Sequence, residues 1–468
     1  MIECDLLIVG GGISGLNTAF QYLRKNKNKK VIVIEKNKRL GGRIYTHQHN
    51  YKNKIYKFDA GAGRINVNHK NLIKLIKYFK LETIKIPTKV NYKPIPKDLY
   101  KDIDSKFSNF DDIINDIKRK LRKKPKSFQN SIKNYTLLGL VDKLYKPINQ
   151  NKSLKLVKNS KNKKSKKKIS SNKKNLFSNY IESRYHYWSE LAVLNAEQAL
   201  KTFEQDFSLK NDYIIIKGGL SNLINKLEVK LKKMNCKILL GTSLESVTKE
   251  INSKSKKKTT KNSNQNNNKY IINNKYKTNQ LVLALQKSTL TKLIKNNKIL
   301  RPINKYLDML SCQPLYRIYA QYPNDKKTGK VWFDDIGKTT TNLEIKYIIP
   351  IDSSKGLIMI SYMDGKYADF WNDLVKKSDI EFRKKLQSQL NLLFPEKKIP
   401  EPLWITHHYW NHGACYWKPK IDGKKMEKEI IKPILNENIF VVNSNFNQKQ
   451  AWIEGGLLSS NRALSMLK

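Results

Sequence analysis

The first forty residues contain two short apolar runs separated by a stretch with helical periodicity. The runs "CDLLIVG" (4–10) and "VIVIE" (31–35) are rich in branched aliphatic residues and predict buried strands. Between them, Leu16, Ala19 and Leu23 recur at helical spacing before the polar stretch "RKNKNKK". A strand, a helix and a second strand in this order predict a βαβ unit in a parallel sheet.

Similar patterns continue along the chain. Helices are predicted after "FDAGAG" and after "KGGL", with apolar faces formed by Leu72, Ile73, Leu75, Ile76 and Phe79 in the first and by Leu220, Leu223, Ile224 and Leu227 in the second. Short strands are predicted in "KILL", "LESVT" and "YIINNKYKTNQLVLAL". The runs "LYRIYAQY", "IKYIIPI" and "GLIMISYMDG" predict further strands, which fit a mixed sheet.

The chain is strongly basic, with 92 Lys and Arg residues, 39 Asp and Glu residues and a net charge of +53. Two low-complexity tracts, 152–174 and 253–269, contain 11 and 6 lysines and no acids, and we expect both to be disordered loops. The lysine excess continues outside the tracts, and asparagine and isoleucine are abundant, which is typical of an A/T-rich coding sequence. Binding of nucleic acid or another polyanion is therefore the less favoured interpretation, and no aromatic residues interleave with the tract lysines.

Several features concern location and metals. No apolar run reaches the roughly 20 residues that a membrane-spanning helix needs, and the N-terminal residues do not resemble a signal peptide. Cys4, Cys236, Cys312 and Cys415 have no paired or Cys-x-x-Cys spacing, which fits a reducing compartment and no metal cluster. We expect an intracellular protein, cytoplasmic or, if the source is a virus, carried in the virion.

The seven histidines show no metal-ligand spacing, and "HH" at 407–408 on a strand would point to opposite faces, so no metal is expected.

The turn after the first predicted strand carries candidate cofactor chemistry. Gly10, Gly12 and Gly15 form a Gly-x-Gly-x-x-Gly pattern, and Glu35 ends the second predicted strand 20 residues after Gly15. Such glycines allow a tight turn, close approach of a pyrophosphate and close helix packing, while the N–H groups of the helix face the phosphates. A carboxylate at Glu35 can accept both ribose hydroxyls. The pattern predicts a dinucleotide site and does not separate NAD from FAD.

The next segment makes that distinction. "EKNKRLGGRIYT" (35–46) resembles the segment that follows the ribose-binding glutamate in the flavin amine oxidase family, which includes monoamine oxidases, polyamine oxidases and L-amino-acid oxidases. The resemblance implies FAD, with Gly41 and Gly42 close to the cofactor and Arg43 at its phosphate and ribityl region. An arginine fork suits phosphate in such a position.

Two internal segments also resemble this family. "FDAGAG" resembles a segment that passes under the flavin ring, which implies that Gly61, Ala62 and Gly63 contact the cofactor. "LESVT" resembles a strand that hydrogen-bonds the adenine through its backbone, and Val247 matches that position.

The C-terminal segment resembles the family's closing strand and helix. "WIEGG" implies that the N-terminus of a helix, at Glu454 and Gly455, lies beneath the isoalloxazine, where its dipole would favour negative charge on the reduced ring. The family usually has Ala-Gly-Glu shortly before this helix. This chain has "VVNSN" instead, with Ser444 or Asn445 in place of the glutamate.

The resemblance also implies residues at the reaction site. "GAGRI" is closest to L-amino-acid oxidases, in which an arginine here grips the substrate carboxylate, so Arg64 either does this or balances charge near the flavin. Tyr416 in "GACY" and Trp452 match the two aromatic walls of the family's amine cage, the alternative being ordinary core aromatics. We expect FAD to be bound non-covalently, with a thioether at Cys415 as the alternative. Arg317 stands where many family oxidases have a lysine that holds a water near flavin N5, which puts the reaction with oxygen in doubt.

These inferences predict an α/β protein with a Rossmann-like FAD-binding domain of the Gly-Gly-Arg (GR2) type and a substrate-binding domain with a mixed sheet and helices. The FAD-binding domain is predicted to be discontinuous. Its segments are 1–80, 211–289 and 431–468, and the substrate-binding domain comprises 81–210 and 290–430.

The resemblance implies oxidation of the C–N bond of a small-molecule amine. A neutral amine would pass a hydride to flavin N5, the imine would be hydrolysed, and oxygen would regenerate FAD with release of hydrogen peroxide. An L-amino-acid oxidase is the nearest alternative, favoured if Arg64 faces the cavity. A further alternative is a catalytically weakened flavin-fold protein with a structural or polyanion-binding role, which Arg317 and the missing Ala-Gly-Glu keep open.

Overall fold

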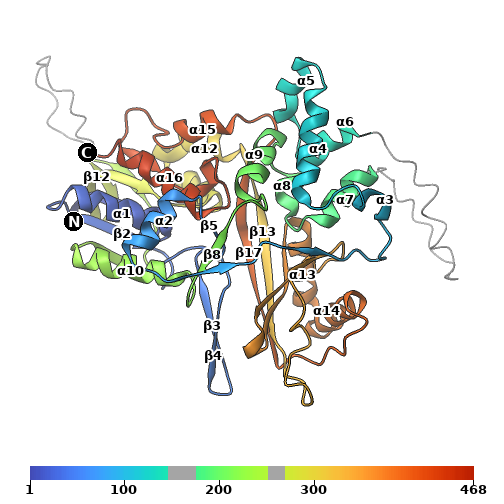
Figure 1. The fold of residues 1–468 in the computed structure, drawn as a ribbon. Coiled ribbons are helices and arrows are strands. Elements are labelled where there is room, and N and C mark those ends of the chain that lie inside the picture. The colour runs from blue at the N-terminus through green and yellow to red at the C-terminus, as the bar shows by residue number, and fades with distance from the viewer. Residues whose placement is uncertain (146–174, 251–268) are drawn as a thin grey trace, which may run out of the picture.

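The computed structural model describes residues 1–145, 175–250 and 269–468. The predicted loop at 152–174 lies outside these residues, as does the predicted loop at 253–269 except for its last residue. Two larger sheets, each with its own helices, organise the described chain, and two small sheets lie between them (Figure 1). Within the described ranges, no helix is both long enough and apolar enough to cross a membrane.

Seven strands form the first sheet: β1 (Ile2–Val9), β2 (Val31–Glu35), β9 (Lys237–Leu240), β10 (Val247–Lys249), β11 (Tyr270–Ile272), β12 (Tyr276–Leu283) and β18 (Ile439–Val441). Their order is β10-β11-β12-β1-β2-β9, and β18 also pairs with β12. The core pairs are parallel, and β10, β11 and β12 form an antiparallel edge. Every residue of β2 is buried, as its apolar run predicts.

Four helices pack on this sheet: α1 (Ile13–Lys25), α2 (Lys70–Tyr78), α10 (Ser221–Lys233) and α16 (Ile453–Leu464). α16 lies so close to α1 that a Cβ on Gly456 would stand 2.6 Å from the Ser14 hydroxyl. The hydroxyls of Thr18 and Ser460 are hydrogen-bonded at 2.8 Å across the same contact. The C-terminal helix is therefore fixed on the N-terminal βαβ unit.

Six strands form the second sheet: β7 (Asn91–Tyr92), β13 (Leu310–Gln321), β14 (Thr339–Thr340), β15 (Tyr347–Asp352), β16 (Leu357–Asp364) and β17 (Trp404–Trp417). Their order is β17-β13-β16-β15-β14-β7, with only the β14–β7 pair parallel, so the predicted mixed sheet is present. Helix α13 (Gly365–Lys377) packs on β13 and β16, and α14 (Asp379–Leu393) packs on α13.

The remaining elements surround these two sheets. β3 (Thr46–Tyr51) and β4 (Lys54–Asp59) form a hairpin, and β5 (Ile65–Asn66), β6 (Thr83–Ile86) and β8 (Tyr213–Ile216) form a small sheet. The other helices are α3 (Lys101–Asp104), α4 (Phe110–Arg122), α5 (Lys126–Ser131), η1 (Ile132–Asn134), α6 (Leu137–Leu144), α7 (Leu176–Arg184), α8 (Trp188–Ala192), α9 (Ala196–Asp206), α11 (Lys287–Asn296), η4 (Lys298–Ile303), α12 (Asn304–Leu307), η5 (Ser353–Lys355), α15 (Gly423–Glu429) and η6 (Ser444–Phe446). In Figure 1, β13 and β17 run between the first sheet and the helices α4 to α8.

The strands of the first sheet come from the segments predicted for the FAD-binding domain, and those of the second sheet from the segments predicted for the substrate-binding domain. The boundaries between the domains stay a prediction. His407 and His408 on β17 do point to opposite faces: the His407 ring lies near Phe382, whereas the His408 ring lies near His47. The described residues contain no cluster of His, Cys, Asp and Glu that could hold a metal ion.

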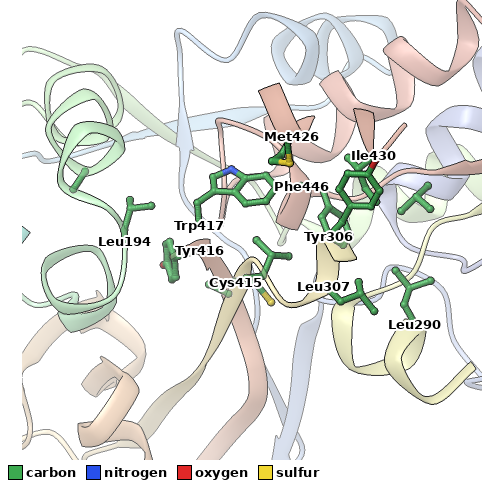
Figure 2. Close-up of a cluster of buried hydrophobic side chains, with 14 of the residues drawn as sticks. Leu194, Leu290, Tyr306, Leu307, Cys415, Tyr416, Trp417, Met426, Ile430 and Phe446 are labelled. Carbon is green, nitrogen blue, oxygen red and sulfur yellow. The ribbon is translucent and has the colours of Figure 1, made fainter. Parts of the chain in front are cut away.

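Two of the four cysteines, which show no paired spacing in the sequence, are joined in the structure. Cys312 on β13 lies directly opposite Cys415 on β17, and a disulfide joins them. The pair is separated by 103 residues, so its spacing in the sequence gave no indication of the contact. Figure 2 shows Cys415 between Tyr416 and Leu307 within a buried apolar cluster. Cys4 and Cys236 are free and buried.

This pairing predicts the number of reactive thiols in the purified protein. A thiol-specific label applied under denaturing, non-reducing conditions should modify two cysteines per chain, Cys4 and Cys236, and should modify four after reduction. The measurement is the mass of the intact labelled protein. Four labels without reduction would contradict the pairing.

Candidate functional site

A cavity of about 1230 Å³ extends between the first sheet and the second. This exceeds the range of roughly 300–1,000 Å³ that is usual for a site holding one small molecule. Its walls include the glycine turns after β1 and β2, the ends of β13, β16 and β17, and the start of α8. The cavity therefore has room for a dinucleotide together with a smaller second ligand.

Two glycine turns build the end of the cavity that lies on the first sheet. The Gly41 N–H donates to the Gly11 carbonyl at 2.8 Å, which holds the turn after β2 against the turn after β1. A Cβ on Gly15 would stand 2.1 Å from the Gly10 carbonyl oxygen, and Gly41 has φ +100°, so both positions require glycine. Gly10, Gly12, Gly41 and Gly42 line the cavity, and their contact with a cofactor stays a prediction.

The N-terminus of α1 faces the same region and is suited to an anion. Gly12 is the N-cap residue of α1, no side chain caps the helix, and the first turn holds no acid. A Cβ on Gly12 would meet no atom within 4 Å. The first N–H groups of α1 therefore keep donor capacity for a ligand, and phosphate is the usual ligand at such a position.

Glu35 ends β2 and lines the cavity, but most of its acceptor capacity is used within the protein. Its Oε2 accepts from the Gly11 N–H at 2.8 Å, and its Oε1 accepts from the Asn37 backbone N–H at 2.8 Å and side-chain amide at 2.7 Å. Three of about four acceptor positions are therefore occupied, which leaves one rather than two for ribose hydroxyls.

Arg43 connects the two glycine turns to the second sheet and the C-terminal segment. Its guanidinium donates to the Gly413 carbonyl and to the Ser444 hydroxyl, both at 2.9 Å, and more weakly to the side chains of Asn443 and Asn445. Burial lowers the pKa of Arg43 to about 10. Where the family usually has a glutamate, this chain therefore surrounds the arginine with neutral acceptors and leaves its charge without an acidic partner among the described residues.

The "FDAGAG" segment follows β4 and lines the cavity with Gly61, Ala62 and Gly63. Asp59 at its start accepts from the Thr46 hydroxyl at 2.6 Å and from the Leu220 N–H at 3.0 Å, so it joins this segment to the turn before α10. Burial raises the pKa of Asp59.

Arg64 follows directly and also lines the cavity. Its guanidinium carbon lies 4.8 Å from the centre of the Tyr213 ring and 5.4 Å from those of Phe207 and Trp452. Its only hydrogen bond within the described residues goes to the Tyr187 hydroxyl, at 3.4 Å. No carboxylate among these residues pairs with it.

Tyr416 and Trp452 both line the cavity, and each is already engaged by the protein. The Tyr416 hydroxyl donates to Glu190 Oε1 at 3.0 Å. Trp452 packs against Arg64 and, edge-on at 4.8 Å, against His69. The two rings share one cavity, and whether they enclose an amine stays a prediction.

Arg317 lines the cavity from β13 and is 8% exposed. It donates to the Asp59 carbonyl at 2.6 Å, and its guanidinium carbon lies 4.3 Å from the centre of the Tyr362 ring. Tyr319 donates to the same carbonyl at 2.7 Å. The side chain is thus fixed beside the segment predicted to pass under the flavin.

Four predicted cofactor residues, Gly15, Val247, Glu454 and Gly455, do not line the cavity. The Val247 N–H donates to Asn297 at 2.6 Å, and Thr242, Ser243 and Leu244 form the wall instead, because β10 turns away into the sheet edge. The Glu454 carboxylate points toward α2 and accepts from the Leu72 N–H. A Cβ on Gly455 would stand 2.2 Å from the Lys449 carbonyl oxygen, so this glycine serves close packing while its neighbours Ile453 and Gly456 line the cavity.

Cys415 does not line the cavity, whereas its neighbours Ala414 and Tyr416 do. Side chains alternate between the two faces of a strand, so this sulfur lies on the opposite face of β17. It is also bonded to Cys312.

Two acids at the cavity were not predicted from the sequence. They are Glu190 on α8 and Asp364 at the end of β16. Asp364 accepts from the backbone N–H groups of Trp188 at 2.6 Å and Ser189 at 3.0 Å, so it fixes the start of α8. Burial raises the pKa of Glu190 to about 8 and that of Asp364 to about 6. Glu190 closely follows the aromatic stretch "YHYW" (185–188), and no known motif includes it.

Comparisons with known proteins agree with this geometry. A model of the flavin containing amine oxidoreductase family matches residues 13–463. An uncharacterised protein of Acanthamoeba polyphaga mimivirus is 22% identical over 99% of this chain and 93% of its own length. A putative L-amino-acid oxidase of Bacillus subtilis (strain 168) is 37% identical, over 20% of this chain and 18% of its own length. Amine oxidase [flavin-containing] B of Bos taurus is 36% identical, over 18% of this chain and 15% of its own length.

Among solved structures, putrescine oxidase bound to putrescine superposes with a TM-score of 0.67 and 14% sequence identity. The match covers 99% of both chains. At this identity the likeness concerns the fold.

The contact between Glu454 and α2 can be tested by mutation. Its carboxylate accepts from the Leu72 N–H at 3.0 Å, the Asn71 N–H at 3.1 Å and the Asn71 amide at 2.6 Å, and so caps the start of α2. Glu454→Ala should lower the free energy of unfolding by about 2–3 kcal/mol, because buried donors to a charged acceptor are left unpaired. Urea denaturation measures this loss.

The control is Glu381→Ala, which removes only an exposed ion pair with Lys377 and should cost less than about 1 kcal/mol. Equal losses in the two variants would show that Glu454 is not a buried cap.

Proposed function

This chain belongs to the family of flavin-containing amine oxidoreductases, and on that premise we propose that it oxidises the C–N bond of an L-α-amino acid whose carboxylate is bound by Arg64. The single observation that carries the choice of substrate is the state of Arg64, a guanidinium at the cavity wall with one long hydrogen bond and no acidic partner in the described chain.

A guanidinium has five N–H donors, and a carboxylate can accept two of them side by side. The rings of Tyr213, Phe207 and Trp452 stack around Arg64 and leave donors without a protein acceptor. A cation enclosed in this way is costly unless an anion joins it. A substrate carboxylate supplies that anion, and the Bacillus subtilis relative described as a putative L-amino-acid oxidase supports the same choice.

The residues around the cavity fit FAD. The uncapped N-terminus of α1 and the guanidinium of Arg43 would bind the diphosphate and its neighbouring groups, and Gly41, Gly42 and Gly61 allow the cofactor to lie close to the backbone. When bound, FAD supplies a hydride acceptor. We infer non-covalent attachment, because the sulfur of Cys415 lies on the far face of β17 and is bonded to Cys312.

Tyr416, Trp452 and Arg317 would shape the space in which the substrate lies. Aromatic walls exclude water from an amine, which favours its neutral form, and Arg64 would orient the α-carbon by fixing the carboxylate. Arg317 is tied to the Asp59 carbonyl and keeps its charge, so it would hold water or an anionic group rather than exchange a proton. Oxygen is the proposed final electron acceptor, with hydrogen peroxide as product.

Two alternative functions can be distinguished from this one by experiment. An amine without a carboxylate would need only the aromatic walls and an acid such as Glu190. The less favoured alternative is a catalytically weakened protein with a structural or polyanion-binding role, which Arg317 and the missing Ala-Gly-Glu keep open.

The substrate assignment predicts a selective defect. Arg64→Lys keeps the charge and loses the fork, and Arg64→Met loses both. We expect the second-order rate constant for an L-amino acid to fall about tenfold in the first and at least about 100-fold in the second, since each charge-assisted hydrogen bond contributes roughly 1.5–3 kcal/mol. The rate for the amine that lacks the carboxylate should change less than about threefold. Hydrogen peroxide release measures both rates.

The matched control is Arg301→Lys, on the exposed surface of η4. The assignment fails if the wild-type protein releases peroxide with amines and with no L-amino acid, or if Arg64→Met affects both substrate classes equally.

A further inference from the structure

Glu190 has a buried carboxylate oxygen that the protein leaves without a partner. The residue is 3% exposed and lies on α8 at the cavity wall. Its Oε1 accepts from the Tyr416 hydroxyl at 3.0 Å, whereas Oε2 has no hydrogen-bond partner among the described residues. A buried polar atom without a partner is rare in proteins and requires an explanation. A donor on a ligand in the cavity would supply the missing bond.

The position of Glu190 relative to Arg64 indicates which donor this is. The Tyr187 hydroxyl is hydrogen-bonded to Arg64 at 3.4 Å, and Glu190 follows Tyr187 by three residues at the start of α8. Asp364 fixes that start by accepting the N–H groups of Trp188 and Ser189. The guanidinium of Arg64, which can bind a carboxylate, and Glu190 Oε2, which lacks a hydrogen-bond donor, therefore lie on adjoining parts of one cavity wall. An α-amino acid carries the complementary pair of groups on a single carbon.

We propose that Glu190 takes the proton from the substrate ammonium and so prepares the neutral amine that is oxidised. In this step an N–H bond of the ammonium breaks, its electron pair stays on the nitrogen, and the proton forms an O–H bond at Oε2. Glu190 becomes a neutral carboxyl and returns the proton to solvent after the product leaves. This role rests on the proposed function, because it assumes an amine substrate in the cavity.

The charges around Glu190 favour such a transfer. Burial raises its pKa to about 8, and the charge of Asp364 acts in the same direction. The Tyr416 hydroxyl and the Arg64 charge act in the opposite direction, and Tyr185 faces Glu190 from the segment before α8. An ordinary glutamate with a pKa of about 4.3 would hold a proton from an aliphatic ammonium, at about 10.4, in only about one complex in 10⁶. A carboxyl near 8 would hold it in about one complex in a few hundred.

The test is the pH dependence of flavin reduction in the purified holoenzyme, mixed without oxygen with an L-amino acid at limiting concentration. In the wild-type protein the second-order rate constant should fall about tenfold per pH unit below a pKa near 8, where Glu190 becomes protonated. In Glu190→Gln this limb should move to the substrate's own ammonium pKa, at about 10. The ionised carboxylate with an ammonium holds the same number of protons as the neutral carboxyl with a neutral amine, so the two proteins should have similar rate constants at pH 7. Between pH 8 and pH 10 the wild-type rate constant should level off, whereas that of Glu190→Gln should continue to rise about tenfold per pH unit.

Two controls separate this role from a structural one. Glu197→Gln, at an exposed glutamate on α9, should leave the profile unchanged. The affinity of Glu190→Gln for a 2-hydroxy acid, which has the carboxylate and no ammonium, should stay within about twofold of the wild type, showing that the Arg64 side of the cavity is intact.

Tyr416→Phe gives an independent measurement. It removes the hydrogen bond that stabilises the ionised carboxylate of Glu190, so the limb should move to higher pH.

The proposal is overturned if the limb is unchanged in Glu190→Gln, if that variant loses the same factor at every pH, or if Tyr416→Phe leaves the limb in place. If only amines without a carboxylate reduce the wild-type flavin, the substrate assignment fails, and the same comparison made with such an amine still decides the role of Glu190.

Discussion

Among the guanidinium groups that line the cavity, those of Arg43, Arg64 and Arg317 form no ion pair with a carboxylate within the described residues. Enclosing an unpaired cation costs several kcal/mol, so a site with three of them is built to receive anions. Arg43 stands beside the glycine turns, where the uncapped N-terminus of α1 adds to the positive potential. Arg64, directly before β5 of the small sheet, stands among aromatic rings. The cavity thus offers one anion site suited to a diphosphate and another suited to a carboxylate.

The fold brings these groups together from distant parts of the chain. Arg43 follows β2, yet it is hydrogen-bonded to Gly413 on β17 and to Ser444 after β18. Asp59 likewise holds Arg317 from β13 and the turn before α10. Side-chain hydrogen bonds that cross between the two sheets therefore join the walls of the cavity. Replacing the family's usual glutamate with Ser444 and Asn445 keeps this connection but removes the counter-charge.

Features that depend on local sequence were predicted well. The βαβ unit, the glycine turns and the strands of the mixed sheet follow from apolar periodicity and from steric limits at glycine, which act over a few residues. Features that depend on long-range contacts were not accessible in this way. The Cys312–Cys415 pairing needs the register of β13 against β17, and the cap that Glu454 provides needs α2 beside α16. Val247 does not line the cavity, because the chain leaves the cavity wall after Leu244 and enters β10 at the edge of the sheet. Glu190 carried no motif at all, since its role depends on a missing partner rather than on spacing.

The central claim is that the bound flavin shares its cavity with a cation that awaits a carboxylate. The direct measurement is a titration of the purified protein's visible flavin spectrum, without oxygen, with a 2-hydroxy carboxylate and with the amide of the same acid. The account predicts that the carboxylate perturbs the spectrum saturably and that the amide does not at the same concentrations. A protein that holds no flavin, or a spectrum that responds equally to both compounds, would contradict it.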